Sequence, residues 1–224
     1  MRVLGSGKAH DELAGMAVLL LGLAGTLATT PALADDLMLT GFPSIVLSGG
    51  SAKAQTRPMQ KPFDNEMKTS AMDVVLERTT LDDIVARFGG TIHKRGNRAA
   101  SIGWICYEVK VGDHFDRHWF IADGSSDEGE NVLTTIAGEE GDKPQAGCEL
   151  GAEELASWTL PVPDLKAGRK ELDTAFGTAT DNGIIRYAHL GRPDAKGHAK
   201  LQALAYRLKD GQVNGVALSQ HTTK

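Results

Sequence analysis

The stretch TTLDDIVARFGG, residues 79–90, predicts a short amphipathic helix with a marked beginning and end. Its apolar side chains recur at the spacing of one helical face: Leu81, Ile84, Val85 and Phe88. Thr80 and Asp83 have the spacing of a capping box, and the carboxylate favours the positive end of the helix. Gly89 and Gly90 are expected to end the helix, because glycine adopts the backbone conformation of a C-terminal cap.

Strand-like segments surround this helix. One precedes it at residues 74–76, and three follow it at residues 101–109, 118–122 and 132–136. Turn-forming dipeptides separate the later strands: Gly112-Asp113 and Asp123-Gly124. This order predicts a short helix packed on an antiparallel meander.

The C-terminal third of the chain has the same order of elements. Residues 165–177, LKAGRKELDTAFG, predict a second helix, and strands are expected at residues 184–187, 204–208 and 216–218. The corresponding positions are Phe88-Gly89 with Phe176-Gly177, Tyr107 with Tyr187, Trp119 with Tyr206, and Asp123-Gly124 with Asp210-Gly211. The sequence therefore predicts an α+β fold of two tandem units, each a short helical layer on a small antiparallel sheet.

These segments resemble a known superfamily at the level of the fold. The resemblance rests on TTLDDIVARFGG, SIGWICYEV and HWFIADG in the first half, and on GRKELDTAFG, GIIRY and LAYRLKDG in the second. A helix that ends at glycine, followed by a meander with aromatic residues, is similar to the SmpA/BamE and β-lactamase-inhibitory-protein (BLIP) superfamily. The resemblance implies helices packed on antiparallel sheets in tandem. It assigns no functional residue.

The beginning of the chain has the pattern of an export signal. The apolar, uncharged residues 13–27 are followed by Ala32-Leu33-Ala34, a small-x-small cleavage site. We therefore expect a signal peptide over residues 1–34 and a periplasmic or secreted protein. An uncleaved N-terminal anchor and a true start at Met16 are the alternatives.

The rest of the chain divides by composition into four segments. We expect a flexible lead-in at residues 35–72, a first α/β unit at 73–142, a connector at 143–159 and a second unit at 160–224. The formal charge of -5 leaves no basic patch for nucleic acid. No segment after the signal has enough apolar residues to span a membrane.

Cys106 and Cys148 are the two cysteines of the chain. In an oxidising compartment two cysteines are expected to form a disulfide, which would restrict the unfolded chain by about 4 kcal/mol. Two buried free thiols are an alternative. A metal site is another, although no third and fourth ligand stand at the spacing of a zinc finger.

Alternation along the strands predicts which side chains face the helices. Arginine is rarely buried, so Arg186 and Arg207 mark the face away from the helix in the second unit. The correspondence between the halves places four side chains in the core: Ile105, Tyr107, Trp119 and Ile121. It places four others on the open face: Trp104, Cys106, His118 and Phe120. Trp104 and Phe120 are thus candidate binding anchors, unless the connector covers them.

Residues 113–118, DHFDRH, are a candidate metal site through His114, His118 and the neighbouring Asp113 and Asp116. On a regular strand the two histidines would stand about 13 Å apart, too far for one ion unless a turn intervenes. A solvated hairpin tip is the alternative. The sequence contains no Gly-x-Ser-x-Gly and no phosphate-binding glycine loop.

These observations favour an exported, non-catalytic binding module that contacts an unknown protein partner through a sheet face. We expect no cofactor. A metal-dependent enzyme or metal-binding protein that uses His114 and His118 is the second hypothesis, and a small-ligand carrier is the third.

Overall fold

The computed structural model describes residues 38–48, 55–96, 101–124, 129, 131–151, 153–179 and 183–223. The signal peptide expected at residues 1–34 lies outside this set. All elements below belong to the unit Asp36–Lys224.

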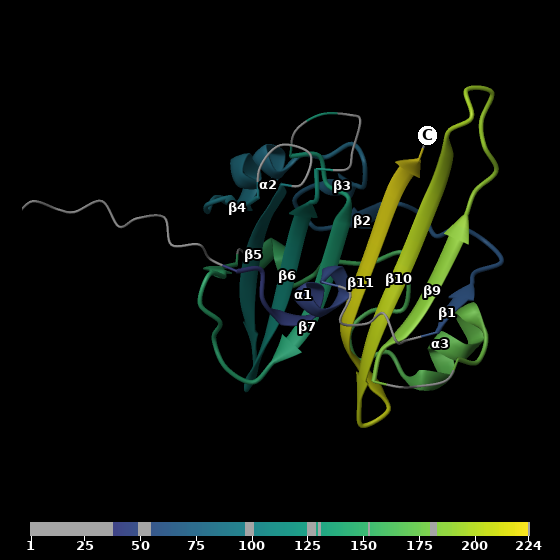
Figure 1. Ribbon diagram of the computed structural model, residues 1–224. Coiled ribbons are helices and arrows are strands. Elements are labelled where there is room, and N and C mark those ends of the chain that lie inside the picture. Colours follow the sequence, from purple (N-terminus) through teal and green to yellow (C-terminus); the bar gives the residue numbers. More distant parts are fainter. Residues whose placement is uncertain are drawn as a thin grey trace, which may run out of the picture. The chain divides into compact units, whose positions relative to one another are not determined.

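Most of the described strands belong to one mixed sheet, which Figure 1 shows face-on. Neighbouring strands run antiparallel except for two parallel pairs, β1 with β9 and β8 with β5. Within the described residues the sheet has nine strands, in the order β1 (Thr56–Pro58), β9 (Ile185–Leu190), β10 (Ala199–Lys209), β11 (Gln212–Thr223), β7 (Thr135–Gly141), β6 (His114–Ala122), β5 (Ile102–Val111) and β4 (His93–Arg95), with β8 (Glu149–Leu150) also beside β5. A separate hairpin pairs β2 (Glu66–Lys68) with β3 (Asp73–Val75).

This continuous sheet overturns the prediction of two tandem units with a small sheet each. Strand β7 pairs antiparallel with β11, so residues 135–139 lie opposite residues 215–219. In two separate sheets, each of these strands would have been an edge with unpaired N–H and C=O groups. Their pairing satisfies those groups and merges the two halves.

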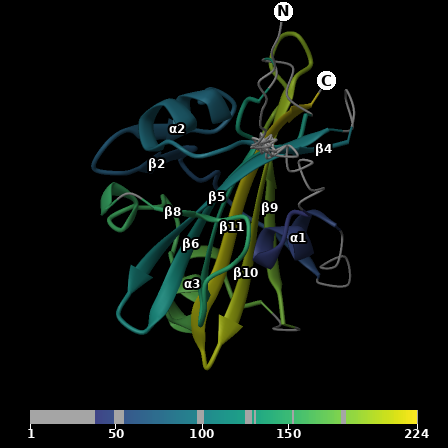
Figure 2. The ribbon, with the colours of Figure 1, turned by 90° about the vertical axis from the view of Figure 1, so that its left-hand side faces the viewer.

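Helices lie on both faces of the sheet, as the edge-on view in Figure 2 shows for α1 and α2. α2 (Leu81–Phe88) and α3 (Arg169–Phe176) contribute buried leucines to the core on one face, which we call the α2 face. α1 (Gly41–Leu47) packs against β7 and β11 on the other, the α1 face. A 3₁₀ turn, Glu153–Leu155, lies in the connector. No helix in the described ranges is long and apolar enough to cross a membrane.

The predicted ends of α2 are confirmed. Thr80 Oγ1 accepts a hydrogen bond from the backbone N–H of Asp83 (3.1 Å), and the Asp83 carboxylate accepts one from the N–H of Thr80 (2.9 Å). Gly89 has a positive φ of 77° at the C-terminal cap. The Tyr107 hydroxyl donates to the carbonyl of Gly89 at 2.6 Å, and this bond fixes the helix end against β5.

A second tyrosine makes the equivalent bond to α3. The Tyr187 hydroxyl of β9 donates to the carbonyl of Gly177 at 3.2 Å, and Gly177 also has a positive φ, 82°. Local features of the two sequence segments therefore recur in space, although the strands that follow them share one sheet.

The predicted side-chain faces are correct for β5 and wrong for β6. Ile105 and Tyr107 belong to the core on the α2 face, as predicted. Trp119 and Ile121 belong instead to the core on the α1 face, whereas Phe120 lies on the α2 face. The prediction aligned Trp119 with Tyr206. Side chains alternate with a period of two, so an alignment error of one residue reverses every face of a strand.

The segment expected to be a flexible lead-in contributes to the fold. Within residues 35–72 the structure describes α1, β1 and β2. Phe42 and Met67 in this segment are fully buried. β1 extends the main sheet beside β9, and its last residue, Pro58, lacks the N–H that a further strand would need.

We predict that Gly138→Ala destabilises the sheet, because an added Cβ would lie 2.5 Å from Cζ2 of the Trp158 ring. Overpacking of this kind costs about 1–3 kcal/mol. The measurement is the free energy of unfolding in urea. Trp158→Phe removes the two ring atoms that collide, so Gly138→Ala should cost clearly less in that background. An equal cost in both backgrounds would contradict the proposed collision.

Candidate functional site

A row of charged side chains crosses the α1 face of the sheet. Successive partners in the strand register from β5 to β10 are Glu108, Arg117, Glu139, Gly215 and Arg207. We call the four charged members the charge row. Glu108 and Glu139 are each 3% exposed, and Arg117 is 7% exposed.

The charge row is internally paired. Arg117 donates through Nε to Glu108 Oε1 at 2.7 Å and through Nη1 to Glu139 Oε1 at 2.9 Å. Arg207 Nη2 donates to Glu139 Oε2 at 3.3 Å, across strand β11. Burial of charge is tolerated when each ion is paired and hydrogen-bonded. This row was not predicted from the sequence, although charged residues inside otherwise apolar strand segments are a signal for it.

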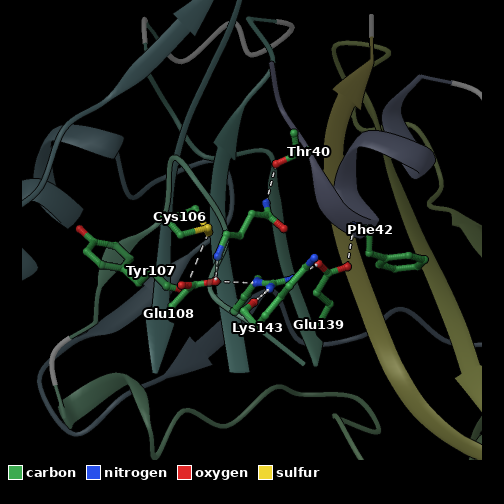
Figure 3. Close-up of a disulfide and its surroundings, with 10 residues drawn as sticks. Thr40, Phe42, Cys106, Tyr107, Glu108, Glu139 and Lys143 are labelled. Atoms are coloured by element: carbon green, nitrogen blue, oxygen red, sulfur yellow. Dashed lines mark hydrogen bonds and ion pairs between the residues drawn. A yellow bond between two sulfur atoms is a disulfide. The ribbon is translucent and has the colours of Figure 1, made fainter. Parts of the chain in front are cut away.

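The beginning of α1 lies directly on the charge row (Figure 3). The backbone N–H of Phe42 donates to Glu139 Oε2 at 2.7 Å. The guanidinium of Arg207 lies over the Phe42 ring, 5.3 Å from its centroid. Glycine at position 215 makes room for this ring, since a Cβ there would lie 3.0 Å from Cγ of Phe42. The buried charges therefore position α1.

The connector is attached to the same row. Cys106 of β5 and Cys148 form the predicted disulfide, with their Cα atoms 4.5 Å apart. The backbone N–H of Gln145 donates to Glu108 Oε1 at 2.7 Å, and Arg117 Nη2 donates to the carbonyl of Lys143. Figure 3 shows the disulfide beside these bonds. One cross-link and several charge-assisted hydrogen bonds thus hold the connector on the α1 face.

The two predicted binding anchors do not form an exposed patch. Trp104 is 3% exposed and belongs to the core on the α1 face, and its ring lies 5.7 Å from that of His93. Phe120 is fully buried on the opposite face. The α1 segment and the disulfide cover the face that carries Trp104. The two candidate anchors are therefore buried on different faces, which agrees with the alternative of a covered surface.

Some of the predicted metal ligands lie close together at the N-terminal end of β6. His114, Asp116 and Glu140 each offer one ligand atom, and these three atoms all lie within 4.8 Å of one another. His118 is not in this group. Burial raises the pKa of Asp116 above its usual value. Burial likewise raises the pKa of Asp164, in the loop before α3, to about 6.

His118 lies farther along β6 in the core of the α2 face. It is 1% exposed, and its ring packs edge-on against Trp158 with a centroid distance of 4.0 Å. Neither ring nitrogen has a hydrogen-bond partner among the described residues. Burial lowers its pKa to about 3, so this histidine is neutral at physiological pH. Its role is to pack rather than to share a metal with His114.

A cavity of about 320 Å³ opens at the other end of the α2 face, beside the β9–β10 hairpin. The basic side chains of its lining come from β9, the hairpin and β10: His189, Arg192, His198 and Lys200. The rest of its lining consists of Pro62, Gly191, Asp194, Gln202 and Thr222. This cavity was not predicted from the sequence. Most of its lining comes from one hairpin, residues 189–202, but Pro62 and Thr222 close it from distant segments.

The floor of this cavity is fixed by a buried polar network. Gln202 Nε2 donates to the carbonyl of Phe63 at 3.0 Å and to Gln220 Oε1 at 2.9 Å. Gln220 in turn donates to Glu77 at 2.7 Å, and the Thr222 hydroxyl donates to the same carboxylate at 2.9 Å. This network holds the cavity floor in one arrangement before any ligand arrives.

We predict that Arg117→Met costs about 3–5 kcal/mol in the free energy of unfolding, because it leaves buried Glu108 without its cation and Glu139 with Arg207 alone. The matched control is Arg87→Met. Arg87 forms a surface ion pair with Glu154 at 3.8 Å, and both side chains are more than 40% exposed. Such pairs contribute less than about 1 kcal/mol. A similar loss in the free energy of unfolding for the two variants would contradict a larger contribution from the buried charge row than from a surface ion pair.

We predict that His118 reduces stability in acid. The unfolded chain binds a proton at this histidine near pH 6.5, whereas the folded chain binds it only near pH 3. The unfolded state therefore binds more protons between these values, and stability is lost as the pH falls through this window.

His118→Leu should consequently lose less stability than the wild type when urea unfolding is compared at pH 7.0 and 4.5. His198→Leu is the control, because His198 lies in the cavity lining with a partly exposed side chain. It should retain the wild-type difference. A wild-type pH dependence in His118→Leu would refute this role.

Comparison with known proteins assigns no relative. No family model, no curated protein and no solved structure matches the chain. The resemblance to the SmpA/BamE and BLIP superfamily therefore stays a prediction, and a functional assignment has to rest on the geometry of the chain itself.

Proposed function

We propose that this chain is an exported, non-catalytic binding protein that holds a small anionic ligand in the cavity beside the β9–β10 hairpin. The observation that carries the proposal is the basic lining of this cavity in a chain with a formal charge of -5. Carboxylate and phosphate groups are the ligands that such a lining favours.

The charges around the cavity favour an anion. Arg192 and Lys200 are cationic side chains, and His189 and His198 are the other basic residues of the lining. Asp194 is the acidic residue of the lining, but its Oδ1 already accepts hydrogen bonds from the backbone N–H groups of Lys196 (2.7 Å) and His198 (2.9 Å). His198 Nδ1 lies 3.9 Å from Asp194 Oδ2, and His189 Nδ1 lies 3.0 Å from the carbonyl oxygen of Met59. The proposal of an anion therefore rests on Arg192 and Lys200.

The fixed floor supports binding as well. Gln202 is 4% exposed, and its amide is oriented by three hydrogen bonds, to both backbone groups of Phe63 and to Gln220. A site that is ordered in advance loses less entropy when a ligand binds. A carrier of small molecules therefore agrees better with this geometry than a partner docked on a sheet face.

Export is the second part of the proposal. The Cys106–Cys148 disulfide supports folding in an oxidising compartment, because such bonds rarely persist in the reducing cytosol. The signal pattern of residues 1–34 supports the same conclusion. We propose the periplasm or the extracellular medium as the site of action.

We predict that the purified chain binds citrate or inorganic phosphate, and that Arg192→Ala/Lys200→Ala weakens this binding. Each charge-assisted hydrogen bond contributes about 1.5–3 kcal/mol, so the double variant should bind at least about 100-fold more weakly. Isothermal titration calorimetry at low salt measures the dissociation constant, and added salt should raise it.

The matched control is Lys110→Ala/Lys170→Ala, which removes two exposed charges away from the cavity lining. It should keep the wild-type affinity. Equal weakening by both double variants would indicate a general charge effect. The absence of binding by the wild-type chain to either anion at millimolar concentration would refute an anion site.

A further inference from the structure

Three candidate ligands converge on the α2 face where β6 begins. Asp116 and Glu140 are directly opposed in the β6–β7 register, and His114 precedes Asp116 by two residues on the same face of β6. One ligand atom from each lies within 4.8 Å of the other two. Metal–ligand bonds of about 2.0–2.2 Å place the ligands of one ion no more than about 4.4 Å apart, so small side-chain movements suffice.

Lys166 contacts the imidazole of His114, with Nζ 3.2 Å from Nε2. A lysine ammonium has donors and no acceptor, so a hydrogen bond between these two atoms requires the tautomer in which Nε2 carries a lone pair. This lone pair is the form in which histidine binds a metal. The ammonium is then a cation already in contact with this ligand.

The neighbouring carboxylate agrees with this assignment. Asp116 Oδ1 lies 3.3 Å from His114 Nε2, yet it is buried and has no hydrogen-bond donor in the described part of the chain. An Nε2 that accepts from Lys166 has no proton to give to this oxygen. In this tautomer two acceptors face each other at close range, and a shared cation would satisfy both.

All three ligands sit on adjacent hydrogen-bonded strands, β6 and β7, rather than on loops. The β6–β7 pairing fixes the backbones of Asp116 and Glu140, so their relative position is set by the sheet. Lys166 comes from a different element, the segment before α3, where its N–H donates to the carbonyl of Val213 at 2.7 Å. Its long side chain can leave the ligands without any change in the sheet.

We infer that His114, Asp116 and Glu140 form a divalent-cation site that prefers Zn²⁺, with Lys166 as the cation that the metal displaces. One imidazole and two carboxylates suit Zn²⁺, and three protein ligands leave a fourth position for water. Ca²⁺ requires six to eight oxygen ligands and is disfavoured here. The site is separate from the anion cavity and does not depend on the function proposed for it.

The test is calorimetric titration of the full chain with Zn²⁺ and, separately, with Ca²⁺. We expect one Zn²⁺ per chain and at least about ten-fold weaker binding of Ca²⁺. His114→Ala and Glu140→Gln should each weaken Zn²⁺ binding at least about ten-fold, and His198→Ala should not. Two different ligand variants keep the test valid if one of them fails to fold.

The variant Lys166→Gln gives the result that distinguishes this site from a surface ion cluster. Removal of a competing positive charge about 4 Å away should tighten Zn²⁺ binding about five-fold or more, whereas Lys110→Gln should leave it unchanged. No stoichiometric Zn²⁺ binding, or no gain in Lys166→Gln, would overturn the inference. Phosphate binding measured on His114→Ala reports on the anion cavity alone, so the two proposals can fail separately.

Discussion

The buried charge row on the α1 face is the interaction on which the arrangement of this chain depends. Glu139 is its centre, because it accepts from Arg117, from Arg207 and from the backbone of Phe42. Its partners come from β6, from β10 and from α1, and the bond to Arg207 spans the junction between the two halves of the sheet. Removal of these charges from water is costly, and the folded state recovers this cost only with every partner present.

This requirement explains why two peripheral segments are held so firmly. The α1 segment supplies an N–H to Glu139, and the connector supplies one to Glu108. The disulfide joins the connector to β5 beside the charge row. Because it restricts the unfolded chain, it stabilises the folded state by about 4 kcal/mol on the chain-entropy model. Covalent and electrostatic attachment thus act on the same strand, β5. The α1 segment and the connector thus cover this face of the sheet.

Features encoded over short stretches of sequence were predictable, and features that depend on distant pairing were not. The capping box at Thr80, the glycine after Phe88 and the Cys106–Cys148 bond follow from local patterns and from the expected compartment. The β7–β11 pairing joins segments about 80 residues apart, and the sequence of neither strand identifies the strand with which it pairs.

The same difference between local and distant features applies to the candidate metal ligands. His114 and Asp116 stand close in sequence and were identified. Glu140 was not, because only the β6–β7 register brings it opposite Asp116. The face of β6 was misjudged because Trp119, rather than Phe120, was aligned with Tyr206. Both rings are aromatic, and composition could not separate the two alignments.

The two candidate ligand sites lie at opposite ends of the α2 face and differ in sign of charge. Carboxylates gather where β6 begins, while basic side chains gather around the β9–β10 hairpin. Between them the sheet is covered by an apolar core that includes Trp158 and the buried ring of Tyr206. This apolar core separates the two sites. Cation and anion sites can therefore coexist on one sheet of an acidic protein.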